Sequence, residues 1–105
     1  MGFNMQKLMK QAQKMQNDVA RVQEELKEKF VAGQAGGGMV KVTANGAQEI
    51  IGISIDPEVI DPEDKEMLED LVLAAVREAL AAAQEIAAQE MSRVTGGMGL
   101  PGGMF

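Results

Sequence analysis

The fold is decided by residues 39–55, which read MVKVTANGAQEIIGISI. Apolar and polar side chains alternate in the first half of this stretch, which is typical of a strand with one buried face. The apolar face of that strand carries Val40, Val42 and Ala44. Asn45-Gly46 follows, the strongest two-residue hairpin signal, because a type I′ turn needs positive φ at both positions. A second strand is predicted over residues 48–55, with one face formed by Ile51, Ile53 and Ile55.

The preceding segment, residues 30–38, reads FVAGQAGGG and predicts a third strand followed by a turn. Its glycines are Gly33, Gly36, Gly37 and Gly38. They lack the Lys-Ser/Thr of a phosphate-binding loop and no helix follows them, so we interpret them as a strand connector. Together the three strands predict an antiparallel meander.

A long helix is predicted before the strands, from Phe3 to about Glu28, because this segment contains no Gly or Pro and its apolar residues recur every three or four positions. That spacing is a heptad seam, formed by Met5, Leu8, Ala12, Met15, Val19, Val22 and Leu26. At about 1.5 Å per residue the helix is roughly 40 Å long. A helix of this length in so small a domain must project from it or find a partner.

A second helix is predicted after the sheet, which ends at Asp56-Pro57. Asp61 is the predicted N-cap, Pro62 takes the first helical position, and helix-forming residues continue to about Arg93. Between residues 71 and 83 this helix is apolar nearly all round, more than one small sheet can cover. Part of it should therefore meet a second subunit, and the candidate dimer contacts are Leu71, Leu73, Val76 and Leu80.

These elements define an α+β fold of the order α-β-β-β-α, with a three-stranded antiparallel meander between two long helices. We expect a single domain over residues 1–94 and a flexible tail rich in Gly and Met over residues 95–105.

Composition narrows the function. The chain has no cysteine and no histidine, which removes the usual ligands of zinc and the side chain best suited to proton transfer near neutral pH. We therefore expect no enzyme activity, no catalytic residues, no metal, no cofactor and no small-molecule substrate. No signal pattern and no stretch of about 20 apolar residues is present, so we expect a cytoplasmic protein without a membrane partner.

Charge is unevenly placed along the chain, whose formal net charge is −6. Residues 1–23 carry a net +3, whereas residues 56–90 hold eleven carboxylates against two cations. Four of the N-terminal cations form a stripe opposite the heptad seam, namely Lys7, Lys10, Lys14 and Arg21. A rod that is buried on one side and basic on the other can lie along the phosphates of a nucleic acid, and Arg93 is added as a further candidate from charge placement. A solvated helix face is the alternative explanation of the stripe.

The acidic run has two explanations. It comprises Asp56, Glu58, Asp61, Glu63, Asp64 and Glu66. A hard-metal site is one, but the run lacks the loop spacing and central glycine of a calcium-binding hand. Helix capping and solubility explain it better.

Several segments together resemble the YbaB/EbfC family of bacterial nucleoid-associated proteins over nearly the whole chain. They are KLMKQAQKMQ at 7–16, MVKVTANG at 39–46, IDP at 55–57, DPEDKEMLEDLVLAAVREAL at 61–80 and TGGMGLPGG at 95–103. The resemblance implies a tweezer-like homodimer that binds duplex DNA with low or variable sequence preference, alters its conformation, and contributes to nucleoid organisation and gene regulation. It places Lys7, Lys10 and Lys14 in the matching arm segment, whereas Arg21 and Arg93 come from charge placement alone.

The main alternative function is a protein-protein interaction adaptor that acts through the heptad helix or the acidic second helix. In that case the lysines of the first helix would only keep it soluble. Binding of DNA that weakens with added salt distinguishes the two functions.

Overall fold

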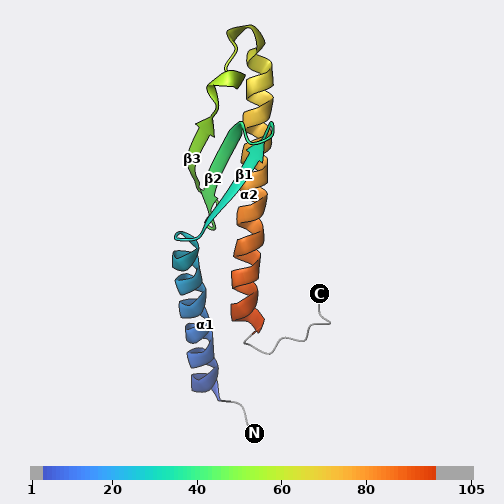
Figure 1. Ribbon diagram of the computed structural model, residues 1–105. Helices are drawn as coiled ribbons and strands as arrows, with labels where there is room; N and C mark the ends of the chain where they lie inside the picture. The colour runs from blue at the N-terminus through green and yellow to red at the C-terminus, as the bar shows by residue number, and fades with distance from the viewer. Residues whose placement is uncertain (1–3, 97–105) are drawn as a thin grey trace.

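The computed structural model describes residues 4–96, and its element order confirms the predicted α-β-β-β-α fold (Figure 1). The helices are α1 (Met5–Leu26) and α2 (Lys65–Gly96), the strands are β1 (Phe30–Ala35), β2 (Val40–Asn45) and β3 (Ile50–Ile55), and two short 3₁₀ helices, η1 (Pro57–Val59) and η2 (Pro62–Asp64), precede α2. Most of the predicted tail, residues 97–105, lies outside the described residues.

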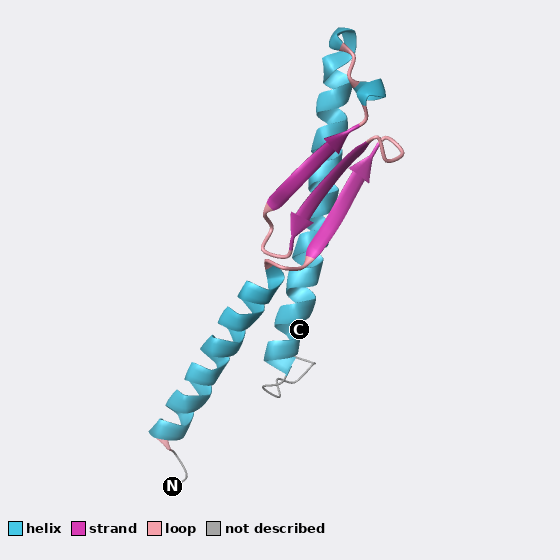
Figure 2. Cartoon of the chain, turned by 60° about the vertical axis from the view of Figure 1, so that its left-hand side comes forward, coloured by secondary structure: helices cyan, strands magenta, loops and turns pink. Residues whose placement is uncertain are grey.

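The chain is elongated rather than spherical. Its radius of gyration is 20.1 Å, whereas a compact domain of this length has about 13 Å. The sheet lies against the middle of α2, and α1 runs antiparallel to the C-terminal part of that helix (Figures 1 and 2). An extended shape leaves apolar side chains uncovered, as described below for both helices.

The core lies between the sheet and α2. The strands are ordered β1-β2-β3, and α2 packs mainly on β1 and β2. The predicted buried face of the central strand is confirmed, because Val40, Val42 and Ala44 are fully buried. The facing stripe of α2 is made of small side chains spaced one turn apart, namely Ala75, Ala79 and Ala83, all fully buried. Small residues on the helix allow the sheet to approach closely.

Gly33 lies in a strand at a point of close approach to α2, so interpreting it as part of a connector was wrong. It lies in the middle of β1, opposite Val42. A Cβ atom at this position would stand 2.3 Å from the backbone nitrogen of Ala79 and 2.4 Å from the carbonyl oxygen of Ala75. Only the three following glycines form the turn, each with positive φ, at Gly36, Gly37 and Gly38.

The hairpin between β2 and β3 is confirmed, but the predicted type I′ turn is wrong. Among the described non-glycine residues only Gln48 has positive φ, at 64°, and Gly46 does not. The loop is closed by a hydrogen bond from the Asn45 N–H to the Glu49 carbonyl, so it contains three residues and ends in a left-handed one. Gly46 serves packing instead, since a Cβ there would stand 2.6 Å from Leu26 Cδ2.

The isoleucines of β3 are less buried than their alternation suggests. In the antiparallel register Ile53 pairs with Val42 and Ile55 with Val40, while Ile51 falls at an irregularity and has no opposed partner. Ile51 and Ile53 remain exposed because β3 is an edge strand and α2 lies across the other two strands.

Short polar residues begin the helices. The Asn4 side chain accepts a hydrogen bond from the Lys7 N–H and caps α1. Asp56 and Asp61 cap the two 3₁₀ helices, and the Asp64 carboxylate accepts from the Met67 N–H in the first turn of α2. The capping interpretation of the acidic run is thus confirmed at three positions. The predicted α-helical start at Pro62 was wrong, because Pro62–Asp64 is a 3₁₀ turn and the α-helix begins at Lys65.

Candidate nucleic-acid interface

The N-terminal half of α1 projects as a basic arm. Lys7, Lys10 and Lys14 are all exposed on it. None of their ammonium groups forms an ion pair with another residue in the described part of the chain, residues 4–96. These three cations are therefore available to an anionic partner.

The heptad seam of the same helix is covered toward its C-terminal end and open at its N-terminal end. Val22 and Leu26 are buried, and Met15 and Val19 are half-buried. Met5 and Leu8 of the seam are 60% and 46% exposed. The remaining contacts between α1 and α2 are few. We predicted that so long a helix must either project or find a partner. Within this chain it projects.

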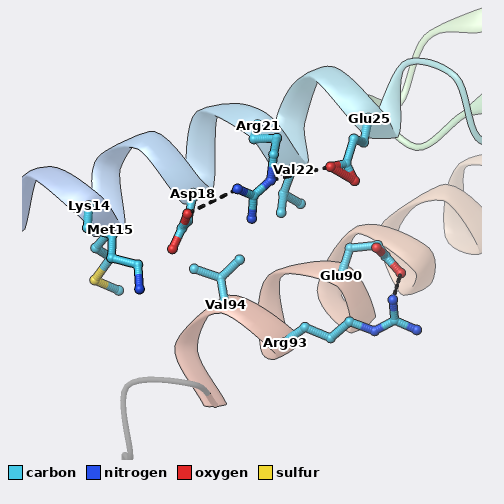
Figure 3. Close-up of a pocket in the computed structure, with 9 residues that line it drawn as sticks. All are labelled: Lys14, Met15, Asp18, Arg21, Val22, Glu25, Glu90, Arg93 and Val94. Atoms are coloured by element: carbon cyan, nitrogen blue, oxygen red, sulfur yellow. Dashed lines mark ion pairs between the residues drawn. The ribbon is translucent and has the colours of Figure 1, made fainter.

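A cleft separates α1 from the end of α2, with a cavity volume of about 340 Å³ (Figure 3). Its lining residues are Lys14, Met15, Asp18, Arg21, Val22, Glu25, Glu90, Arg93 and Val94. Three cations and three carboxylates therefore face the same space. Of the candidate DNA contacts, the cleft brings together Lys14, Arg21 and Arg93, while Lys7 and Lys10 do not line it.

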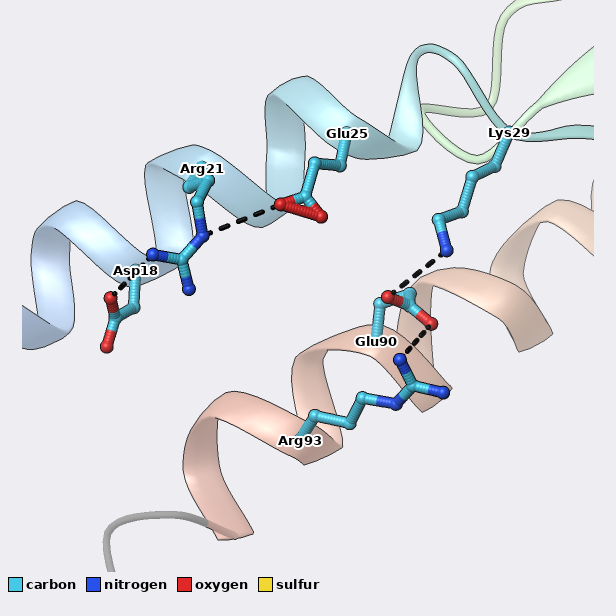
Figure 4. A network of polar contacts seen from close by, with 6 residues as sticks. All are labelled: Asp18, Arg21, Glu25, Lys29, Glu90 and Arg93. Carbon is cyan, nitrogen blue, oxygen red and sulfur yellow. Dashed lines mark ion pairs between the residues drawn. The ribbon is translucent and has the colours of Figure 1, made fainter.

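The two arginines differ from the lysines because both are already paired. The Arg21 guanidinium lies 3.3 Å from Asp18 Oδ1 and 3.5 Å from Glu25 Oε1. Arg93 lies 3.5 Å from Glu90 Oε2 (Figure 4). Both arginine side chains are largely exposed, so the pairs are weak and screened by salt. A phosphate approaching either arginine must also approach these carboxylates.

Two participants in this charge network were missed by sequence reasoning. The Glu90 carboxylate forms ion pairs with both Arg93 and Lys29. Lys29 lies in the segment between α1 and β1. The three-residue spacing of Glu90 and Arg93 was a usable helical signal. No local pattern links Lys29 to Glu90.

The acidic residues before and at the start of α2 lie at the opposite end of the molecule from the lysines. In Figure 1 this end of α2 is at the top, and the N-terminal end of α1 is at the bottom. The long axis of the chain measures 75 Å, far more than the Debye length of about 8–10 Å at ordinary salt. A charge at the N-terminal end of α1 is therefore screened from these carboxylates.

The candidate dimer residues fall on both covered and uncovered parts of α2. Leu73 is 48% exposed, whereas Leu71, Val76 and Leu80 are half-buried, Leu71 and Val76 against the core. An apolar groove of about 440 Å³ runs along this helix and is lined by Leu68, Glu69, Val72, Leu73 and Val76. It is an uncovered apolar surface next to the core.

Within the described residues no group of three or more carboxylate, histidine or cysteine side chains is placed to hold a metal ion. Neither of the two long helices, over the part of each that is described, is apolar enough along its length to cross a membrane.

Comparison with protein families gives one match over almost the whole chain. The model of the YbaB/EbfC DNA-binding family matches residues 1–98. A nucleoid-associated protein of Pelotomaculum thermopropionicum is 59% identical over 102 residues, which cover 97% of each chain. A nucleoid-associated protein of Moorella thermoacetica is 62% identical over 99 residues, covering 94% of this chain and 95% of the relative.

A solved structure has the same fold. The crystal structure of the uncharacterized protein HP0035 from Helicobacter pylori superposes with a TM-score of 0.74 at 25% sequence identity. The match covers 83% of this chain and 91% of that one.

Proposed function

The chain belongs to the YbaB/EbfC DNA-binding family, and from this premise we propose that it binds duplex DNA through the phosphate backbone, with low or variable sequence preference. The observation that carries the proposal is the arm of α1, where Lys7, Lys10 and Lys14 are exposed and unpaired within the described residues. Arg21 and Arg93 are secondary contacts, because each must first leave a carboxylate.

The mode of contact follows from the side chains on the arm. Lysine is a compact charge on a flexible stem and binds phosphate without the fixed fork that lets arginine recognise a base edge. Contacts to phosphate position a protein on the duplex but carry no direct sequence information. This supports binding of low specificity, in which DNA shape matters more than base identity.

A salt titration of the unmodified protein tests the proposal. Each phosphate contact lowers log K by about 0.9 per unit of log salt, so three lysines give a slope of about −2.7 for one arm and roughly −5 for two. We expect fluorescence anisotropy on two unrelated duplexes to give similar affinities and slopes in this range. An adaptor protein would show no salt-linked binding, and that result would end the proposal.

The same proposal includes a homodimer. The chain is elongated, and the apolar groove on α2 and the exposed Ile51 and Ile53 of the edge strand leave apolar surface that a second copy could cover. Two copies joined at α2 would supply two basic arms, the arrangement that a tweezer-like binder needs.

Leu73→Glu is expected to weaken this dimer at least tenfold, roughly, because it would bury an unpaired carboxylate at the interface. Leu73 is 48% exposed in the single chain, so the substitution should leave the subunit folded. Gln84→Glu is the matched control, since it adds the same charge at an exposed α2 position outside the groove. Sedimentation equilibrium measures both variants. A monomeric mass for the unmodified protein at micromolar concentration would contradict the dimer.

The cellular role we propose is that of a bacterial nucleoid-associated protein. The curated relatives described above carry that name. For this chain it implies a cytoplasmic protein located on the nucleoid, which changes DNA conformation and thereby contributes to nucleoid organisation and gene regulation. The two arms of the proposed dimer would supply the means of altering the path of a bound duplex.

A further inference from the structure

Glu90 is a buried carboxylate at the place where α1 and α2 meet. It is 8% exposed and is the only charged residue in the described part of the chain that is buried. Its Oε1 lies 3.4 Å from Lys29 Nζ and its Oε2 lies 3.5 Å from an Arg93 guanidinium nitrogen (Figure 4). One carboxylate thus bridges two cations from different segments.

The Lys29–Glu90 ion pair joins residues far apart in the sequence, unlike the other ion pairs between described residues. Every other ion pair between described residues joins side chains three or four positions apart, within one helix or its cap. Lys29 lies between the end of α1 and the start of β1, whereas Glu90 lies near the end of α2. This is therefore the ion pair that ties the base of the α1 arm to α2.

Stability alone does not explain a buried charge at this position. Removing a carboxylate from water is costly, and attraction to its partners roughly offsets that cost, so an apolar residue of similar size is often at least as stabilising. An ion pair differs from apolar contact in that it has a preferred distance and direction. The Glu90 bridge therefore contributes defined geometry.

The α1 arm needs such a constraint. Its buried seam is confined to Val22 and Leu26, and the cleft opens between the helices beyond them. Apolar contact is non-directional, so two buried side chains near one end leave the helix free to change its angle. Lys29 follows the last turn of α1, where such a change of angle would begin.

Resting on the DNA-binding function proposed above, we propose that Glu90 is a positioning residue. Through Lys29 it holds α1 at a fixed separation from the end of α2. That separation sets the spacing at which Lys14 on one helix and Arg93 on the other meet the phosphates of one duplex.

A positioning role and simple electrostatics predict opposite changes in DNA affinity when the charge of Glu90 is removed. A carboxylate beside a DNA site repels phosphate and occupies two cations, so removing its charge should strengthen binding if Glu90 has no positioning role. If Glu90 fixes the arm, removing the charge loosens the geometry, and Glu90→Gln should bind DNA about threefold to tenfold more weakly. Glu85→Gln is the matched control, because Glu85 is an exposed carboxylate five residues earlier on α2.

The distance between α1 and α2 can be measured in the absence of DNA. The chain has no cysteine, so cysteines placed at the exposed positions Gln13 on α1 and Gln84 on α2 are the only sites for spin labels. Pulsed electron resonance on labelled protein, diluted with excess unlabelled chain, gives the distance distribution between the helices. We expect Glu90→Gln to broaden this distance distribution. Lys29→Gln should broaden it as well, and it changes no residue of α2. Glu85→Gln should leave the distribution unchanged.

Two results would overturn the positioning role. The first is a pair of distance distributions, for Glu90→Gln and Lys29→Gln, that match that of the unmodified protein. The second is that Glu90→Gln binds DNA at least as tightly as the unmodified protein. Circular dichroism checks that each variant is folded, and Lys29→Gln carries the distance test if Glu90→Gln is not. Failure of the unmodified protein to bind DNA would end the proposed function, while the distance distributions would still decide whether Glu90 positions the arm.

Discussion

Gly33→Ala is expected to lower the free energy of unfolding by at least 3 kcal/mol, roughly, a large part of the stability of so small a domain. The added Cβ would stand 2.3 Å from the backbone nitrogen of Ala79, 2.4 Å from the carbonyl oxygen of Ala75 and 2.9 Å from the carbonyl carbon of Glu78. All three are backbone atoms of α2, so no side-chain rotation relieves the overlap. Strand β1 must move away from the helix, which breaks up the core between them.

Gly37→Ala is the control for this substitution. Gly37 has φ of +68°, and a Cβ there would meet nothing within 4 Å, so only backbone strain of about 1–2 kcal/mol is expected. Urea unfolding followed by circular dichroism, at equal protein concentration, compares the two variants. If Gly33→Ala unfolds at the same urea concentration as Gly37→Ala, the close approach of β1 to α2 is not as tight as described.

The buried face of β2 was predictable because it depends only on the alternation of neighbouring residues in the sequence. The alternation of residues 40–44 depends only on which side chains face the core, and the structure buries the expected ones. The role of Gly33 was not predictable in the same way. In the sequence it stands close to three turn-forming glycines, and only its contact with Ala75 and Ala79 distinguishes it from them.

The hairpin illustrates the same limit. Asn45-Gly46 correctly located a reversal of the chain, but the turn type depends on what surrounds it. The Gly46 N–H donates to the carbonyl oxygens of Leu26 and Lys29, and the Asn45 side chain accepts from the N–H groups of Ala47 and Glu49. These contacts to the end of α1 and within the loop outweigh the intrinsic preference for a type I′ turn.

The candidate site was partly predictable for similar reasons. The heptad seam places Lys7, Lys10 and Lys14 on the opposite face, and the structure leaves all three exposed. The ion pairs of Arg21 with neighbours three and four positions away were readable from helical spacing. The Lys29–Glu90 pair was not, because it joins residues that only the tertiary fold brings together.

The helix α1 should tolerate the reversal of its three lysines to glutamate. Lys7, Lys10 and Lys14 are exposed and make no ion pair among the described residues, so no buried contact is lost. Lys7 lies in the first turn of α1, where a carboxylate interacts favourably with the helix dipole. Circular dichroism and the subunit mass should therefore match the unmodified protein.

Reversing all three lysines to glutamate is expected to weaken DNA binding at least 100-fold, roughly, and to leave none measurable at moderate salt, because three phosphate contacts per arm are replaced by repulsion. The control is the reversal of Lys41 and Lys65, which are exposed on β2 and at the start of α2. It lowers the net charge at positions away from the arm and should weaken binding only slightly. Fluorescence anisotropy at several salt concentrations separates the two, because losing arm contacts also flattens the salt slope. If the triple variant folds, keeps its subunit mass and binds with unchanged affinity and slope, α1 is not the DNA-binding arm, and the site must be sought on another face.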